Sequence, residues 1–91
     1  MKTTAVLSVL GKDRTGIVAK VSKTLYECSA NIDDIRQTIL GDIFSMAMIV
    51  TLDEDVCPFN TVQERLAKDG EELGLQVTLQ RKDVFDFMYS I

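Results

Sequence analysis

The chain has 91 residues, 46% of them hydrophobic, and its ten Lys and Arg against fourteen Asp and Glu give a net charge of −4 at pH 7. This length and composition predict a single globular domain, residues 1–91, with one modest core. An acidic chain without a basic patch is poorly suited to binding nucleic acid or an anionic membrane, so we expect neither as a partner.

The first half of the chain predicts a strand and then a helix. Residues 3–10 are apolar on both faces and rich in β-formers, which suits a central strand. After a glycine-flanked break, apolar residues recur at helical spacing from Ile17 to about Ser29, which predicts an amphipathic helix. Asp13 or Thr15 is placed to cap its start.

The middle of the chain predicts a hairpin. Residues 31–40 form a strand whose first half is weakened by two adjacent aspartates, and residues 43–52 give the strongest strand pattern in the chain. Gly41 and Asp42 between them predict a two-residue turn. The acidic run that follows, residues 53–55, is typical of a solvated loop.

A second helix is predicted from Phe59 to about Leu73, with Pro58 in its first turn and Gly74 as the left-handed residue that ends it. Residues 75–81 alternate as a strand does. The remaining apolar tail, residues 84–91, should either fold over the sheet or join an interface with another copy.

The predicted order is β-α-β-β-α-β, which indicates an α+β ferredoxin-like sandwich: a four-stranded antiparallel sheet with two helices on one face. The second strand should lie at an edge. The residues expected in the core are Leu7 or Val9, Val21, Leu25, Val50, Leu66 and Val77. Because this fold serves many functions, it does not decide the function by itself.

The residue types argue against catalysis and against a metal or other cofactor. The chain has no histidine, which removes the commonest general base and many metal sites. Cys28 and Cys57 lack the spacing of a metal or redox motif, and the acidic residues lack that of a calcium loop. With no signal-peptide pattern in the sequence, two isolated thiols predict a cytoplasmic protein.

The segment with the strongest functional signal is the loop made of Gly11, Lys12, Asp13, Arg14, Thr15 and Gly16. The helix that follows offers free backbone N–H groups and a partial positive charge, which favour a carboxylate. Asp13 complements an ammonium group, and Asn31, which can lie beside the loop, adds a donor and an acceptor. This set fits an amino acid. The alternative is a plain glycine-flanked turn in which Asp13 only caps the helix.

The run GKDRTGIVAKVSKTLYECSANIDDIRQTI, followed by Gly41 and Phe44-Ser45-Met46, resembles the ACT domain. The resemblance covers about residues 3–82 and leaves 83–91 as a tail. The chain is most similar to stand-alone single-ACT bacterial proteins and to the ACT domains of formyltetrahydrofolate deformylases and of the glycine-cleavage repressor.

The resemblance implies dimers paired side by side through helix one and strand two. An effector amino acid would sit at the seam, held by the Gly11–Gly16 loop of one subunit and the Asn31-Ile32 pair of the other. Thr15 departs from the family, in which proline is common there. No catalytic or DNA-binding domain accompanies the motif, so the regulated protein stays unidentified.

These observations predict a homodimeric sensor of an amino acid or a similar small metabolite. The main alternative is an interaction module that docks on a protein partner through the same edge and binds no metabolite. An enzyme is the weaker third reading. An amino-acid panel distinguishes the first two.

Overall fold

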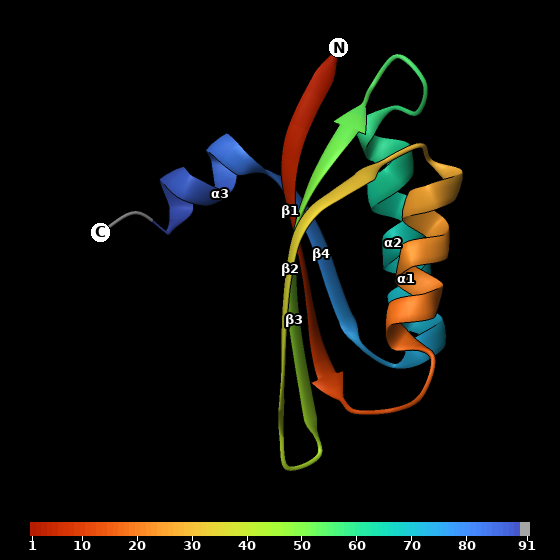
Figure 1. Ribbon diagram of the computed structural model, residues 1–91, viewed down its shortest axis with the longest axis vertical. Helices are drawn as coiled ribbons and strands as arrows, with labels where there is room; N and C mark the ends of the chain where they lie inside the picture. Colours follow the sequence, from red (N-terminus) through yellow and green to blue (C-terminus); the bar gives the residue numbers. More distant parts are fainter. Residues whose placement is uncertain (90–91) are drawn as a thin grey trace.

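The computed structural model describes residues 1–89 and has two layers (Figure 1). Four strands, β1 (Lys2–Lys12), β2 (Asn31–Leu40), β3 (Ile43–Asp53) and β4 (Gln76–Arg81), form an antiparallel sheet in the order β2-β3-β1-β4. Helices α1 (Ile17–Glu27) and α2 (Phe59–Leu73) cover one face, and a short helix, α3 (Lys82–Met88), follows β4. The predicted ferredoxin-like sandwich is confirmed, with the long β1 in the interior of the sheet.

The core lies between the sheet and the two long helices. Alternate residues of β3 point toward the helices and are buried, as the period of a strand requires. On the helices, Val21, Leu25 and Leu66 are at most 1% exposed. The predicted core is confirmed at Leu7, Val9 and Val50, which are also buried, but Val77 is only half-buried against the same cluster.

Strand β2 is an edge strand, as expected, and all ten of its residues are solvent-exposed. A β-bulge interrupts its pairing with β3 between Ile32 and Asp34, where the sequence placed its weak half. Gly41 takes a positive φ in the predicted hairpin turn. The outer backbone groups of β2 therefore remain open to a further strand.

Helix α1 differs from the prediction at both ends. It stops at Glu27 rather than near Ser29, because Ser29 turns to a φ of 58° and the Ala30 N–H donates to the Leu25 carbonyl. At its start, no side chain caps it. Neither Asp13 nor Thr15 accepts a first-turn N–H, and Gly16 occupies the cap position in a left-handed conformation.

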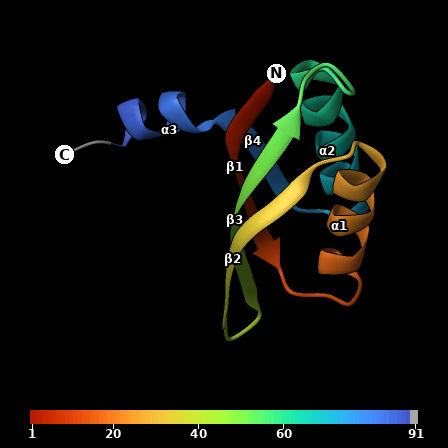
Figure 2. The ribbon, with the colours of Figure 1, turned by 45° about the horizontal axis from the view of Figure 1, so that its top comes forward.

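The tail forms α3, which the sequence did not predict because seven residues are too few to show a helical period. Figures 1 and 2 show α3 projecting from the sheet on the side opposite α1 and α2. Its ring pair, Phe85 and Tyr89, has centroids 4.6 Å apart. The expectation for the tail also covered Ser90 and Ile91, which lie outside the described residues.

Candidate functional site

The loop Gly11–Gly16 joins the end of β1 to the start of α1 at the hairpin end of the sheet (Figure 1). The Asp13 N–H donates to the Asp42 carbonyl over 2.7 Å, and Lys12 Nζ lies 3.9 Å from an Asp42 carboxylate oxygen. The loop is thus fastened to the β2–β3 turn. Lys12, Asp13, Arg14, Thr15 and Gly16 are exposed, and Gly11 is half-buried.

The uncapped start of α1 leaves the carboxylate of Asp13 outside the helix's own hydrogen bonding. The first intrahelical bond runs from the Lys20 N–H to the Gly16 carbonyl, at 3.0 Å. The N–H groups of the first turn therefore have no side-chain acceptor, so an external anion can bind there without displacing one. Asp13 therefore does not cap the helix, whereas the alternative of a plain glycine-flanked turn remains.

Two loop residues have structural partners that the sequence did not reveal. A side chain on Gly11 would meet the Leu75 side chain at 2.4 Å and the Leu75 Cα at 3.3 Å, so glycine allows β1 to pass close to the α2–β4 connection. Arg14 donates from Nη1 to the Leu73 carbonyl over 3.3 Å at the end of α2. Both contacts brace the loop against the second half of the chain.

Asn31 and Ile32 lie at the other end of the sheet. Asn31 pairs with Thr51 on β3, whereas Gly11 pairs with Phe44, seven positions earlier on the same strand. At roughly 3.3 Å per residue, that offset is about 23 Å. One chain therefore does not bring Asn31 beside its own Gly11–Gly16 loop, and no small ligand spans the two.

The Asn31 side chain belongs to a polar cluster around the bulge. Its Nδ2 donates to Asp33 Oδ1 over 2.6 Å, and the Thr51 hydroxyl donates to the other Asp33 oxygen. The hydroxyl, and then the amide, hold the pKa of the Asp33 carboxyl below its ordinary value. Asn31 Oδ1 remains available to accept from a ligand ammonium group.

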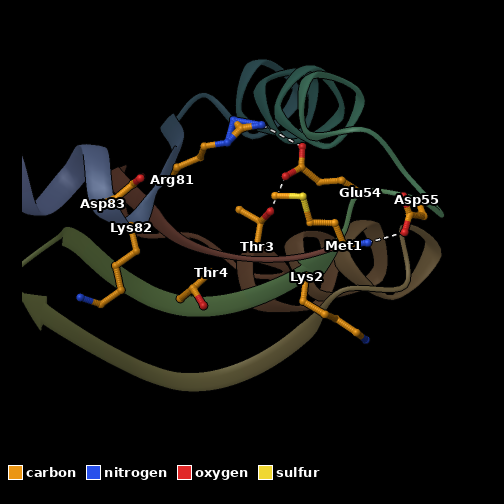
Figure 3. Close-up of a pocket in the computed structure, with 9 residues that line it drawn as sticks. All are labelled: Met1, Lys2, Thr3, Thr4, Glu54, Asp55, Arg81, Lys82 and Asp83. Carbon is orange, nitrogen blue, oxygen red and sulfur yellow. Dashed lines mark hydrogen bonds and ion pairs between the residues drawn. The ribbon is translucent and has the colours of Figure 1, made fainter.

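A hollow of about 530 Å³ lies near the Asn31 end of the sheet and not at the predicted loop. Figure 3 shows Glu54 held between Thr3 and Arg81, with the guanidinium 2.8 Å from Glu54 Oε1. These two donors, Thr3 first, lower the pKa of the Glu54 carboxyl. The hollow is lined by Met1, Lys2, Thr3, Thr4, Glu54, Asp55, Arg81, Lys82 and Asp83.

Most charges around this hollow are already paired within its wall. Arg81 also covers the Phe59 ring at 4.3 Å, and the Met1 amino group binds Asp55. This cluster was not predicted, because residues 53–55 were expected to form a solvated loop. The strand order brings the cluster together, since β1 pairs Thr3 with Leu52, near Glu54, and pairs Ala5 with Arg81. These pairings stabilise this end of the sheet and leave few charged groups of the hollow free to bind a ligand.

Cys28 is buried at the end of α1, and Arg65 Nη1 lies 3.5 Å from its sulfur. Burial, and then the neighbouring thiol of Cys57, raise the pKa of Cys28, which suits an unreactive core thiol. Among residues 1–89, no group of three or more potential ligands is gathered for a metal ion. No helix in that range is long and apolar enough to cross a bilayer.

The model of a known family, described as the ACT domain, matches residues 3–80. The chain belongs to the ACT domain family. A UPF0237 protein of Methanocaldococcus jannaschii is 50% identical over 86 residues, which cover 94% of this chain and 96% of that protein. An ACT domain protein from Streptococcus pneumoniae superposes with a TM-score of 0.79 at 36% identity, covering 92% of this chain and 94% of that one.

Longer proteins of known structure share the same fold over part of their length. The regulatory subunit of aspartate kinase from Thermus thermophilus, in its ligand-free form, matches with a TM-score of 0.65 at 29% identity, covering 86% of this ACT chain and 50% of that one. A glycine cleavage system transcriptional repressor matches with a TM-score of 0.80 at 23% identity, over 89% of this chain and 46% of that one. A Burkholderia mallei formyltetrahydrofolate deformylase matches with a TM-score of 0.77 at 15% identity, over 87% of this chain and 28% of that one. At these identities the two show the fold alone. The resemblances drawn from the sequence are thereby confirmed at the level of family and fold.

Proposed function

We propose that this ACT protein is a cytoplasmic, homodimeric regulatory module, a single domain of residues 1–91, that binds an amino acid between two copies and has no catalytic activity of its own. Membership of the ACT family, whose domains generally regulate by binding amino acids or other small ligands, supports the regulatory role. The observation that carries the proposal is the separation of the loop from Asn31 in one chain.

A second copy removes that separation. Antiparallel pairing of two β2 strands about a two-fold axis places the start of one β2 beside the end of the other. The end of β2, Leu40, pairs with Ile43, and Ile43 pairs with Lys12 of the loop. The partner's Asn31 would therefore lie next to the Gly11–Gly16 loop, although Asn31 of the same chain is about 23 Å away.

The exposed edge of β2 supports this pairing. A ten-residue edge strand with open backbone groups is a template for another strand, and Ile32, Ile35 and Ile39 along it are 37%, 36% and 58% exposed. In the paired site, the ligand carboxylate would accept from the first-turn N–H groups of α1. Its ammonium would face Asp13 and the side-chain oxygen of the partner's Asn31.

Calorimetry with the twenty amino acids on the wild-type protein tests the proposal, followed by Asp13→Ala and Asn31→Ala. Each variant loses a charge-assisted hydrogen bond worth roughly 1.5–3 kcal/mol, so binding should weaken by about tenfold or more. Glu64→Ala, which removes an exposed carboxylate on α2, is the matched control and should bind as the wild type does. Absence of binding below millimolar concentration, or unchanged binding in both site variants, favours the ligand-free interaction module.

A further inference from the structure

The two cysteines of the chain are neighbours in the fold, although they are far apart in the sequence. Cys28 stands at the end of α1, and Cys57 comes directly before α2, and these two ends lie at the same end of the helical layer (Figures 1 and 2). Cys28 belongs to the buried core, and Cys57 packs against that core. Both thiols are free, and each faces the other rather than a third ligand group.

Polar contacts between the two helices hold this alignment. The hydroxyl of Thr24 donates to the buried Asp69, and the guanidinium of Arg65 binds Glu27 at the last turn of α1. The Nη1 atom of the same guanidinium lies 3.5 Å from the sulfur of Cys28. Arg65 therefore fastens the end of α1 to α2 and places a cation beside the thiol pair.

The backbone at each cysteine is held by the fold. The Cys28 N–H donates to the Thr24 carbonyl over 3.1 Å, and the Cys57 N–H donates to the Asp53 carbonyl over 3.0 Å. Two groups that are held close together in this way react as though each were highly concentrated around the other. The native fold therefore favours a reaction between these thiols over a reaction of either with another chain.

The two thiols differ in their access to solvent. Cys28 is 2% exposed, whereas Cys57 is partly exposed, so a small oxidant reaches Cys57 and not Cys28. Burial, and then the Cys57 thiol, raise the pKa of Cys28, and Arg65 opposes this shift. Cysteines that sense oxidants are commonly accessible and stand next to a second cysteine that resolves the first product. A thiol that acts only as a small hydrophobe needs neither that neighbour nor a cation.

We propose that Cys57 and Cys28 form a reversible disulfide when the protein meets hydrogen peroxide. The sulfur of Cys57 attacks one peroxide oxygen, the O–O bond breaks, and the other oxygen leaves with the thiol proton as water. Cys57 is then a sulfenic acid. The sulfur of Cys28 attacks the sulfur of Cys57, the S–O bond breaks, and the hydroxide leaves with the Cys28 proton as a second water. Each sulfur gives up one electron, and the peroxide takes both.

The disulfide joins the α1–β2 connection to the β3–α2 connection. The guanidinium of Arg65 stabilises the thiolate of Cys28 as that sulfur becomes the nucleophile. The bond restricts the unfolded chain between residues 28 and 57, and a dithiol reductant opens it again by exchange. A transient, redox-sensing bond is the kind found in cytosolic proteins. It uses no residue of the proposed amino-acid site, so the inference holds whether or not an amino acid binds.

Intact-mass spectrometry of the reduced full chain, treated with hydrogen peroxide and then alkylated in denaturant, tests the pair. The wild type should lose two hydrogen atoms and accept no alkyl group, and dithiothreitol should restore two thiols that can be alkylated. A non-reducing gel should show no link between chains. At one fixed protein concentration, the Tm of the oxidised protein should rise by about 8 °C or more.

Variants treated with dimedone, which traps sulfenic acid, test the order of the steps. Cys28→Ala should accumulate the adduct on Cys57, because no second thiol resolves the sulfenic acid, whereas Cys57→Ser should leave the buried Cys28 unmodified. Arg65→Gln should increase trapping by about threefold, since a half-exposed cation acts weakly. Lys68→Gln, which removes an exposed cation from the same helix, is the matched control and should trap as the wild type does.

Circular dichroism verifies that each variant is folded. Alkyl groups on the peroxide-treated wild type overturn the proposal, as does a link between chains in place of the internal bond. An oxidised protein that melts below the reduced one overturns the native proximity of the two thiols. A dimedone adduct on Cys28 in Cys57→Ser overturns the order of attack, and equal trapping in Arg65→Gln and Lys68→Gln overturns the role of Arg65.

Discussion

Replacing Gly70 by alanine should have two opposite effects on the free energy of unfolding, one from helix propensity and one from packing. Gly70 lies inside α2 and is buried. Propensity alone predicts that alanine stabilises a helix interior by about 1 kcal/mol. The added methyl, however, would stand 2.8 Å from Val77 Cγ2 and 2.9 Å from the Leu75 carbonyl oxygen. The valine can rotate, but the carbonyl belongs to the backbone, and the Leu75 N–H is held by the Gly70 carbonyl at 2.9 Å.

Helix α2 must therefore move away from β4 to accept the methyl. Overpacking of this kind costs about 1–3 kcal/mol. With the rigid carbonyl placing the cost at the upper end, the net loss should be about 2 kcal/mol, or roughly 8–16 °C in Tm. Thermal and urea unfolding at one fixed protein concentration measure it, since association adds to stability. Ala67→Gly, on the exposed side of the same helix, should lose about 1 kcal/mol through propensity alone. A Gly70→Ala protein as stable as the wild type, or more so, would refute the close approach of α2 and β4.

Three further predictions concern stability. Leu25→Ala should lose about 2–5 kcal/mol through the cavity it leaves, whereas Tyr26→Ala, its 82% exposed neighbour, should change stability by less than ~0.5 kcal/mol; similar melting of the two would contradict the core assignment. Thr24→Val should cost about 1–3 kcal/mol in urea unfolding, because it removes the hydroxyl that donates to the buried Asp69 carboxylate, and a neutral result would deny that bond. Four carboxyl groups, those of Asp33, Asp53, Glu54 and Glu72, have pKa values below their ordinary ones. The stability that they contribute is therefore present above the ordinary pKa values and is lost as the pH falls through the lowered pKa values of the folded state. Glu54→Gln should make the Tm fall less steeply at acid pH in a series of melts at different pH values.

The sequence was sufficient for features that local chemistry determines. Strand β2 and helix α2 begin and end where the patterns placed them, because Gly41 and Gly74 take the left-handed conformations that end each segment. The weak half of β2 became a bulge, since adjacent aspartates pack poorly within a ladder. Period and turn chemistry are properties of a few neighbouring residues, so they can be inferred without the fold.

Features that depend on distant residues were not accessible in this way. The close fit of Gly11 on Leu75 and the Glu54–Arg81 pair join segments that only the sheet order brings together. The cap expected from Asp13 or Thr15 is absent: Gly16 occupies the cap position, and the Asp13 N–H donates to the Asp42 carbonyl across the sheet end. The distance between the loop and Asn31 follows from strand register, and it changes the candidate site from one chain to two.

The proposal that two chains complete one site can be tested by mixing two defective proteins. Asp13→Ala and Asn31→Ala homodimers should each bind the amino acid found for the wild type at least about tenfold more weakly. After subunit exchange in an equimolar mixture, each heterodimer carries one site with both substitutions and one intact site, so calorimetry should recover about a quarter of the wild-type sites at wild-type affinity. A wild-type protein that binds no amino acid, or a mixture that exchanges subunits and recovers no binding, would contradict the account.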